Sequence, residues 1–438
     1  MIIDVPRDAP RARYALATLL ALLGVDSRDA QPGEQADVGY GRPGTRVTIS
    51  ATPARDWDNP VPQLARIGGV PVIHLGPPPA NVARIDLLYA AYASLTAPWE
   101  RVDPADEVGC PLGREGWLAR NGLLHEPLVH RYAELLARAL GVDPPHREPL
   151  VVLTHDIDNN WRHLFGVRER AELLRRDLGA RRPHAVRRAA GLAREIARRP
   201  KADPGDRFDD WAAWHAEWGG RPAFFVASYG LFRAGSDRRD VPYDVRHPEV
   251  GATLRRLAAD GAEIGVHLSF QARASAGQLR RERGALAEVL GAPVLTARHH
   301  WLALDRPAEK TLRLHADAGL ELDCSLGYND CAGFRRGIAA PFHPFDHETE
   351  GPLAIWELPT IAMDAALFHG RSRVDALAEL RSLHKTVSGA AGALVLDWHV
   401  HAADPAALNG AGAGLRAFLG EARATLATPL EAVEAFAR

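Results

Sequence analysis

Short apolar runs that end abruptly in polar residues recur through the last two thirds of the chain. The first, LVVLTHDID at residues 150–158, is a row of leucine and β-branched residues followed by histidine and aspartates. Helical patterns such as EVGATLRRLAAD at 249–260 separate most of the runs. Strands that alternate with helices form parallel βαβ units. We therefore predict an α/β fold with a distorted (β/α) barrel of about seven strands. The six later runs lie at 223–226, 263–266, 294–297, 320–324, 354–358 and 393–396.

The first hundred residues predict a smaller α/β unit. From residue 97 to 148 the chain is rich in proline, glycine and charge, which is typical of a connecting region. We therefore predict an N-terminal α/β domain over residues 1–125, a connecting region to about residue 148, and the barrel over residues 149–438. Helices are predicted at 10–24, 83–95 and 127–140, and strands at 46–51 and 70–75.

The composition argues against several classes of protein. Acidic and basic residues nearly cancel to a net charge of -2, so no overall field directs the chain toward nucleic acid or an anionic membrane. The three cysteines have no zinc-site spacing. The apolar run at 14–25 lacks a cleavage site and fits a buried helix, and no stretch reaches the ~20 apolar residues of a membrane span. We therefore predict a cytoplasmic protein with no nucleic-acid partner and no membrane span.

Ionisable side chains follow five of the predicted strands, and the carboxyl ends of such strands meet at one rim. Carboxylates and imidazoles together can bind a divalent metal, and a spare carboxylate and imidazole can act as general base and general acid. Ligands of nitrogen and oxygen favour zinc first, with manganese, iron and cobalt as alternatives. The residues are His155, Asp156, Asp158, His267, Arg298, His299, His300, Asp323, Asp397, His399 and His401.

Asp156 and Asp158 are two residues apart, so an extended strand places both on one face. Two like charges at that distance need a cation beside them. A bound metal supplies one, and Arg298 can hold the other carboxylate ionised and oriented.

The chain from about residue 149 to the C-terminus resembles the polysaccharide deacetylase family, which is carbohydrate esterase family 4 with NodB homology. Three segments carry the resemblance: THDID at 154–158, AEIGVH at 262–267 and VLDWH at 395–399. They are similar to the family's first motif, its metal-histidine motif and its last motif.

This resemblance implies a role for each matching residue. Asp156 would be the catalytic base, and Arg298 would orient it. Asp158 and His267 would bind the metal, and His399 would protonate the leaving amine. Each position matches a motif of the family residue by residue.

The third metal ligand is open, because Gln271 stands where better-known members carry a second histidine. His300 is the first choice and His399 the second. If His399 is a ligand, the general acid is His300 or His401.

The most similar pattern belongs to a divergent bacterial branch of the family. Members of this branch commonly carry an N-terminal domain, which residues 1 to about 125 also resemble. The motifs of this branch are RxHxL at 298–302, DxSLG at 323–327, GFR at 333–335 and WH at 398–399. The expected substrate contacts are Arg335, Asp323 and the two tryptophans beside rim histidines, Trp301 and Trp398.

We therefore predict a metal-dependent hydrolase that removes an N-acyl group, most simply acetyl, from an amino sugar or polysaccharide precursor. The expected partner is a small-molecule or oligosaccharide amide. Two alternatives remain, a hydrolase of a non-sugar amide or imide and a catalytically inactive glycan-binding module. Segment 162–201 carries 13 Lys/Arg against 4 Asp/Glu. We expect this segment to be a solvated insertion rather than a binding site for an anionic substrate.

Overall fold

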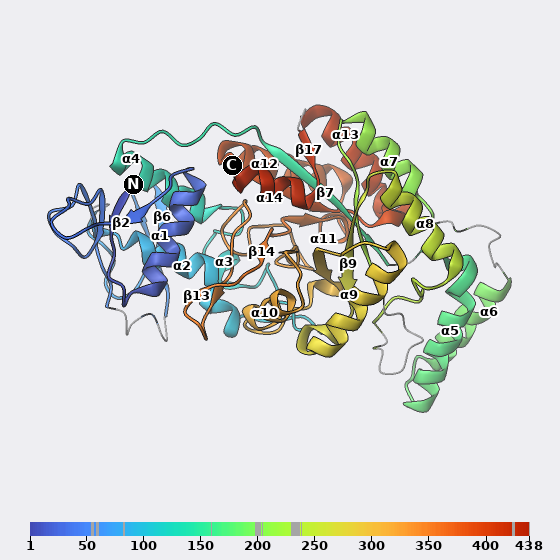
Figure 1. Cartoon of the computed structure of the whole chain (residues 1–438). Coiled ribbons are helices and arrows are strands. Elements are labelled where there is room, and N and C mark those ends of the chain that lie inside the picture. The colour runs from blue at the N-terminus through green and yellow to red at the C-terminus, as the bar shows by residue number, and fades with distance from the viewer. Residues whose placement is uncertain are drawn as a thin grey trace.

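A curled sheet of nine parallel strands forms the centre of the molecule (Figure 1). The computed structural model describes residues 1–53, 57, 61–81, 84–158, 160–197, 203, 205–228, 237, 239–422 and 425–437. The sheet order is β14-β11-β10-β9-β8-β7-β16-β15, with β17 paired to the start of β7. The strands are β7 (Leu150–Ile157), β8 (Ala223–Val226), β9 (Glu263–Leu268), β10 (Thr296–His299), β11 (Leu322–Asp323), β14 (Trp356–Glu357), β15 (Ala362–Met363), β16 (Ala393–Asp397) and β17 (Thr425–Ala427).

The predicted barrel is confirmed, and contacts across its interior show how strongly the sheet curls. Arg298 on β10 lies four strand positions from Asp397 on β16, about 19 Å along a flat sheet. Their side chains are nevertheless 3.1 Å apart. The two edge strands, β14 and β15, are joined by only residues 358–361, so the chain itself closes the ring. Seven strands were predicted, and β15 and β17 are additional because neither lies in an apolar run of four or more residues.

Alternate residues of each strand face the barrel interior, as the period of two requires. The amino-terminal half of the interior is apolar, with Val152, Phe225 and Val395 in one buried cluster. Gly265 is needed there, because a Cβ atom would lie 2.7 Å from the Phe225 ring. The carboxyl-terminal half of the interior is polar. The candidate site therefore lies directly above a tightly packed apolar layer.

Helices cover the outside of the sheet, as expected for parallel strands. They are α7 (Phe208–Glu217), α8 (Pro248–Ala259), α9 (Ala276–Leu290), α10 (Glu309–Asp317), α11 (Asp364–Phe368), α12 (Arg373–Gly389), α13 (Ala411–Ala422) and α14 (Pro429–Ala437). A hairpin of α5 (Arg162–Gly179) and α6 (Ala185–Ala197) is inserted after β7 and lies at the edge of the molecule (Figure 1). It occupies the predicted basic insertion, of which residues 198–201 are outside the described residues.

The N-terminal part combines a four-stranded parallel sheet, order β2-β1-β3-β4, with three longer helices. Helix α4 was expected in the connecting region, but it packs against α1 and α2 and so belongs to this layer. The elements are β1 (Ile2–Asp4), α1 (Pro10–Leu22), β2 (Arg28–Asp29), β3 (Val38–Tyr40), β4 (Val47–Ile49), the antiparallel pair β5 (Gln63–Ile67) and β6 (Val70–His74), α2 (Leu87–Thr96), α3 (Trp117–Arg120) and α4 (Leu128–Leu140).

A buried ion-pair network ties the connecting region to the barrel. Glu100 accepts two hydrogen bonds from Arg335, at 2.9 and 3.2 Å, and lies 3.6 Å from Arg336. Arg336 also donates to Glu309 on α10 at 3.2 Å. The four side chains are at most 7% exposed, so each charge depends on its partners for stabilisation.

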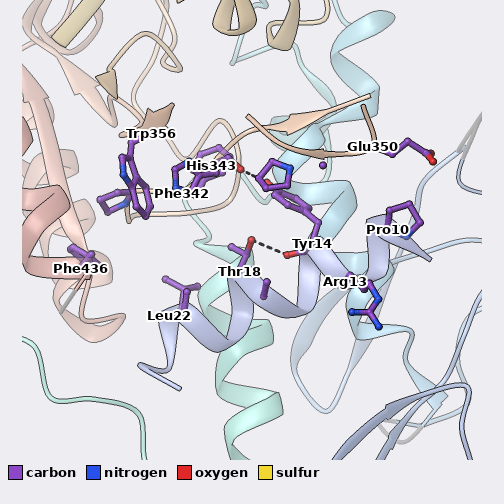
Figure 2. Close-up of a pocket in the computed structure, with 15 residues that line it drawn as sticks. Pro10, Arg13, Tyr14, Thr18, Leu22, Phe342, His343, Glu350, Trp356 and Phe436 are labelled. Atoms are coloured by element: carbon purple, nitrogen blue, oxygen red, sulfur yellow. Dashed lines mark hydrogen bonds between the residues drawn. The ribbon is translucent and has the colours of Figure 1, made fainter. Parts of the chain in front are cut away.

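An apolar cavity of about 500 Å³ lies between α1 and the barrel (Figure 2). Tyr14 and Leu22 line one side, and Phe342, Trp356 and Phe436 line the other. The Tyr14 hydroxyl donates to the carbonyl of His343 at 2.8 Å, which links α1 to the short hairpin of β12 (Phe345–Asp346) and β13 (Gly351–Pro352). The cavity lies beside the start of β14, at the opposite end of that strand from the candidate site.

Candidate metal and catalytic site

Three of the predicted metal ligands converge at the carboxyl-terminal rim. One ligand atom from each of Asp158, His267 and His300 lies within 4.8 Å of the other two. The Nε2 atoms of His267 and His300 are 3.4 and 3.5 Å from the Asp158 oxygens. The rim therefore brings together one carboxylate and two imidazoles from β7, β9 and β10.

The hydrogen-bond pattern of this cluster suits a cation. His267 Nδ1 lies 3.1 Å from the Arg298 carbonyl, and a carbonyl can only accept a hydrogen bond, so Nδ1 carries the proton. In the neutral ring Nε2 then presents a lone pair toward Asp158. Both His267 Nε2 and Asp158 Oδ1 are buried without a hydrogen-bond partner among the described residues. Buried polar atoms seldom lack partners, so this orphaned pair fits a metal-binding position.

Beside the cluster, Arg298 forms a buried ion pair with Asp156. The guanidinium donates to Asp156 Oδ1 at 2.9 Å, to the Cys324 carbonyl at 3.1 Å and to the Thr360 hydroxyl at 3.1 Å. Burial raises the pKa of Asp156, but His267, Arg298 and His399 outweigh it and lower that pKa below its ordinary value. Asp156 is therefore an ionised carboxylate held in one orientation.

Asp397 shares the same guanidinium at 3.1 Å. Burial, followed by the charge of Asp156, raises the pKa of Asp397 to about 8. The two pKa shifts have opposite directions, so Asp156 is the more acidic carboxyl of the pair, a common arrangement where one of two carboxylates acts as a base.

His399 is oriented by a carboxylate that sequence reasoning missed. Asp364, at the start of α11, lies 2.8 Å from His399 Nδ1 and accepts the His399 backbone N–H at 2.9 Å. The opposite ring nitrogen, Nε2, lies 3.3 Å from Asp158. Burial lowers the pKa of His399, but Asp364 and Asp158 raise it well above its ordinary value. Asp364 follows β15, a strand too short to be recognised, so its place at the rim had no sequence signal.

The candidates for the third ligand differ in their positions. His300 joins Asp158 and His267, whereas His399 groups with Asp156 and Asp397. Gln271 is exposed at the start of a short 3-10 turn, Ala272–Ala274. His399 Nε2 also lies 3.3 Å from Asp158, but its Nδ1 is held by Asp364.

Three expected substrate contacts lie in the interior instead of at the opening. Asp323 is fully buried, 2.9 Å from His315 Nδ1. Trp398 is fully buried and donates to the Ala411 carbonyl at 3.2 Å. Arg335 is 1% exposed and pairs with Glu100. Since their polar atoms already have partners inside the protein, we do not retain these three as substrate contacts.

Two of the rim histidines face the covering helices. His155 Nε2 lies 2.9 Å from His215, and His299 Nε2 lies 2.9 Å from His315. Each occupies the position between two inward-facing residues, so the period of the strand turns it away from the site.

Trp301 is the predicted contact that does reach solvent. Its side chain is 45% exposed, and its ring centroid lies 5.4 Å from that of His300. The residue has φ of 61°, a strained conformation for a bulky side chain. Asn329 donates to the Trp301 carbonyl at 2.7 Å and to Asp106 at 2.9 Å, which anchors this turn to the connecting region.

Comparison with known proteins gives matches in structure alone. No family model matches the sequence, and no curated protein matches it. A polysaccharide deacetylase structure from Mycobacterium smegmatis, described as putative, is 20% identical, with a TM-score of 0.43, over 67% of this chain and 91% of that one. The catalytic domain of a peptidoglycan N-acetylglucosamine deacetylase from Eubacterium rectale is 10% identical, with a TM-score of 0.32, over 65% and 90%.

A pseudoenzyme of carbohydrate esterase family 4 from Bacillus anthracis is also similar, at 8% identity and a TM-score of 0.33, over 66% of each chain. These structural neighbours are described as polysaccharide deacetylases or as a relative of that family. No helix among the described residues is long and apolar enough to cross a membrane.

Proposed function

We propose that this protein is a metal-dependent hydrolase that removes an N-acyl group, most simply acetyl, from an amino sugar or polysaccharide precursor. One observation carries the proposal: the Asp158–His267–His300 cluster, in which Asp158 Oδ1 and His267 Nε2 lack hydrogen-bond partners among the described residues, lies beside a carboxylate, Asp156, and an oriented imidazole, His399. Amide hydrolysis needs a base for water and an acid for the leaving amine, and these are the groups that the rim provides.

Asp158, His267 and His300 would hold the metal, with zinc as the first expectation for nitrogen and oxygen ligands. When bound, the metal supplies positive charge that polarises the amide carbonyl and lowers the pKa of water. Asp156 takes the proton of the attacking water, and Arg298 keeps this carboxylate oriented. His399 delivers a proton to the departing nitrogen from Nε2, because Asp364 occupies Nδ1. Trp301 offers an exposed aromatic face beside the opening on which a sugar ring can stack.

Turnover of N-acetylated amino-sugar oligosaccharides by the purified, metal-loaded chain tests this proposal. Release of acetate with one metal ion per chain supports it. Turnover restricted to non-sugar amides or imides would favour the other hydrolytic function. Glycan binding with no acetate release at any metal loading would identify an inactive binding module.

The ligand assignment predicts that Asp158→Ala and His267→Ala each lower the bound metal at least about tenfold, since losing a direct ligand costs more than the ~10–100-fold typical of an outer partner. Metal content of dialysed protein measures this. His146→Ala is the matched control, because its side chain is 93% exposed and it lies before the start of β7, at the opposite end of that strand from the rim. Unchanged metal content in both site variants would remove Asp158 and His267 from the ligand set.

The role of Asp364 predicts a selective defect. Asp364→Asn should lower kcat on an amide about 10- to 100-fold, part of the ~10²–10⁴ that a positioned general acid supplies. Bound metal should stay the same. Hydrolysis of a nitrophenyl acetate should change little, because its leaving group needs no proton. Equal losses on amide and ester would mean that Asp364 supports the fold of the rim instead of proton transfer.

A further inference from the structure

Helix α6 exposes an apolar face and turns a polar one toward α5. On its inner side, Glu195 pairs with Arg162 of α5 at 2.7 Å, and Arg188 pairs with Asp177 of α5 at 3.1 Å. The two helices approach closely at Gly166, where a Cβ atom would lie 2.6 Å from Glu195. Charged side chains therefore fasten α6 to α5, which is the reverse of an ordinary surface helix.

The outer side of α6 is a continuous apolar surface. Val186 and Ile196 are 80% and 59% exposed. At 3.6 residues per turn these side chains share one face with exposed alanines. The alanines are Ala189, Ala190, Ala193 and Ala197. Of the seven large apolar side chains exposed in the described chain, three belong to this hairpin, Leu178 being the third. The exposed apolar surface is thus concentrated here.

Arginines border this apolar face. Arg187 and Arg194 follow its edge along α6, and Arg181 and Arg182 lie in the exposed turn before it. The described hairpin, residues 162–197, contains ten arginines and four acidic residues, a net charge of +6 with neutral histidines. The rest of the chain has to be acidic on balance, since the whole carries -2. Positive charge is therefore localised on the segment that lies at the edge of the molecule (Figure 1).

We propose that the outer face of α6 docks on the surface of an anionic phospholipid bilayer. An amphipathic helix whose apolar face is bordered by arginines lies in the plane of such a surface, with its side chains among the head groups and upper acyl chains. The four acidic residues of the hairpin pair with arginines inside it, so the outer edge stays positive. Anionic lipids attract such clusters.

Charge also distinguishes this occupant from a second copy of the chain. A symmetric contact through α6 would bring two hairpins of charge +6 together, and like charges at an interface oppose association. A polyanion such as nucleic acid would satisfy the arginines but leave Val186 and Ile196 in water. A bilayer with anionic head groups satisfies both features.

Co-sedimentation of the full chain with vesicles tests the proposal. Vesicles of phosphatidylcholine with 30% phosphatidylserine should retain the protein, and vesicles of phosphatidylcholine alone should retain much less. The double variant Val186→Ser/Ile196→Ser should lower the retained fraction about tenfold. The double variant Arg187→Glu/Arg194→Glu should lower it by a similar factor, because it removes the attraction between each arginine and the anionic lipids. High salt should release the wild-type chain.

Two matched controls separate this face from general surface properties. Val374→Ser changes an apolar side chain that is 75% exposed on α12, and Arg280→Glu reverses an exposed charge on α9. Both should bind like the wild type. The proposal is overturned if the wild-type chain ignores anionic vesicles, or if the controls lose binding as much as the α6 variants. It is also overturned if Val186→Ser/Ile196→Ser abolishes a dimer in solution, which would identify the face as a contact between copies.

Discussion

Asp156→Asn should lower turnover by about 10² to 10⁴, the rate factor that a positioned general base usually contributes, while leaving the metal in place. The asparagine has nearly the same shape but cannot take the proton of water. The fold should tolerate the change, because Asp397 lies 3.1 Å from Arg298 and can supply the negative charge that the buried guanidinium needs. Removing the charge of Asp156 also removes one cause of the raised pKa of Asp397, which favours that ionisation. Steady-state kinetics on an N-acetylated oligosaccharide and metal analysis of the same sample measure both effects.

Asp158→Asn is the informative comparison, because it removes a carboxylate two residues away that has a different role. This variant should lose metal first and activity as a consequence, and added metal should partly restore both. Arg298→Ala should act in the same direction as Asp156→Asn, since it misorients the base. If Asp156→Asn loses metal and Asp158→Asn retains it, the two roles are reversed. If neither variant changes turnover, the chemistry lies elsewhere in the barrel.

The central strands of the barrel could be predicted because each is a buried apolar run with a clear polar stop. β7, β9 and β16 carry Asp156, His267 and Asp397 at or near that stop, and parallel strands deliver such ends to one rim. The period of two then determines which residues enter the site. It places Asp158 and Arg298 inside, while His155 and His299 turn toward the helices.

Other features of the site depend on contacts between segments that are far apart in the sequence. Asp364 faces His399 only because the ring closes between β14 and β15, two strands of two residues each. Arg335 belongs to a motif near the rim residues, yet Glu100 of the connecting region binds it in the interior. A lone arginine in a sequence does not reveal which carboxylate will neutralise it. The burial of Arg335 therefore could not be predicted from the residues around it in the sequence.

Substitution of this same Glu100 should have the largest effect on the stability of the fold. Glu100→Ala should lower the free energy of unfolding by about 3–5 kcal/mol, because it leaves the buried guanidinium of Arg335 without its partner. Arg335 is 1% exposed and Arg336 has only Glu309 at 3.2 Å to replace the lost charge. Urea and thermal unfolding of the full chain measure the change.

Glu115→Ala is the matched control, an exposed glutamate of the same connecting region that should stay within about 0.5 kcal/mol of the wild type. Acid gives a second test. Burial raises the pKa of Glu100, but Arg335 and Arg336 outweigh it and lower that pKa below its ordinary value. A lowered pKa in the folded state stabilises the protein above the ordinary glutamate range, and this contribution disappears as the pH falls through the folded value. The difference between wild type and Glu100→Ala should therefore shrink in acid. A variant as stable as the wild type at neutral pH would show that the connecting region is held on the barrel by apolar packing and that the buried ion pairs add nothing to it.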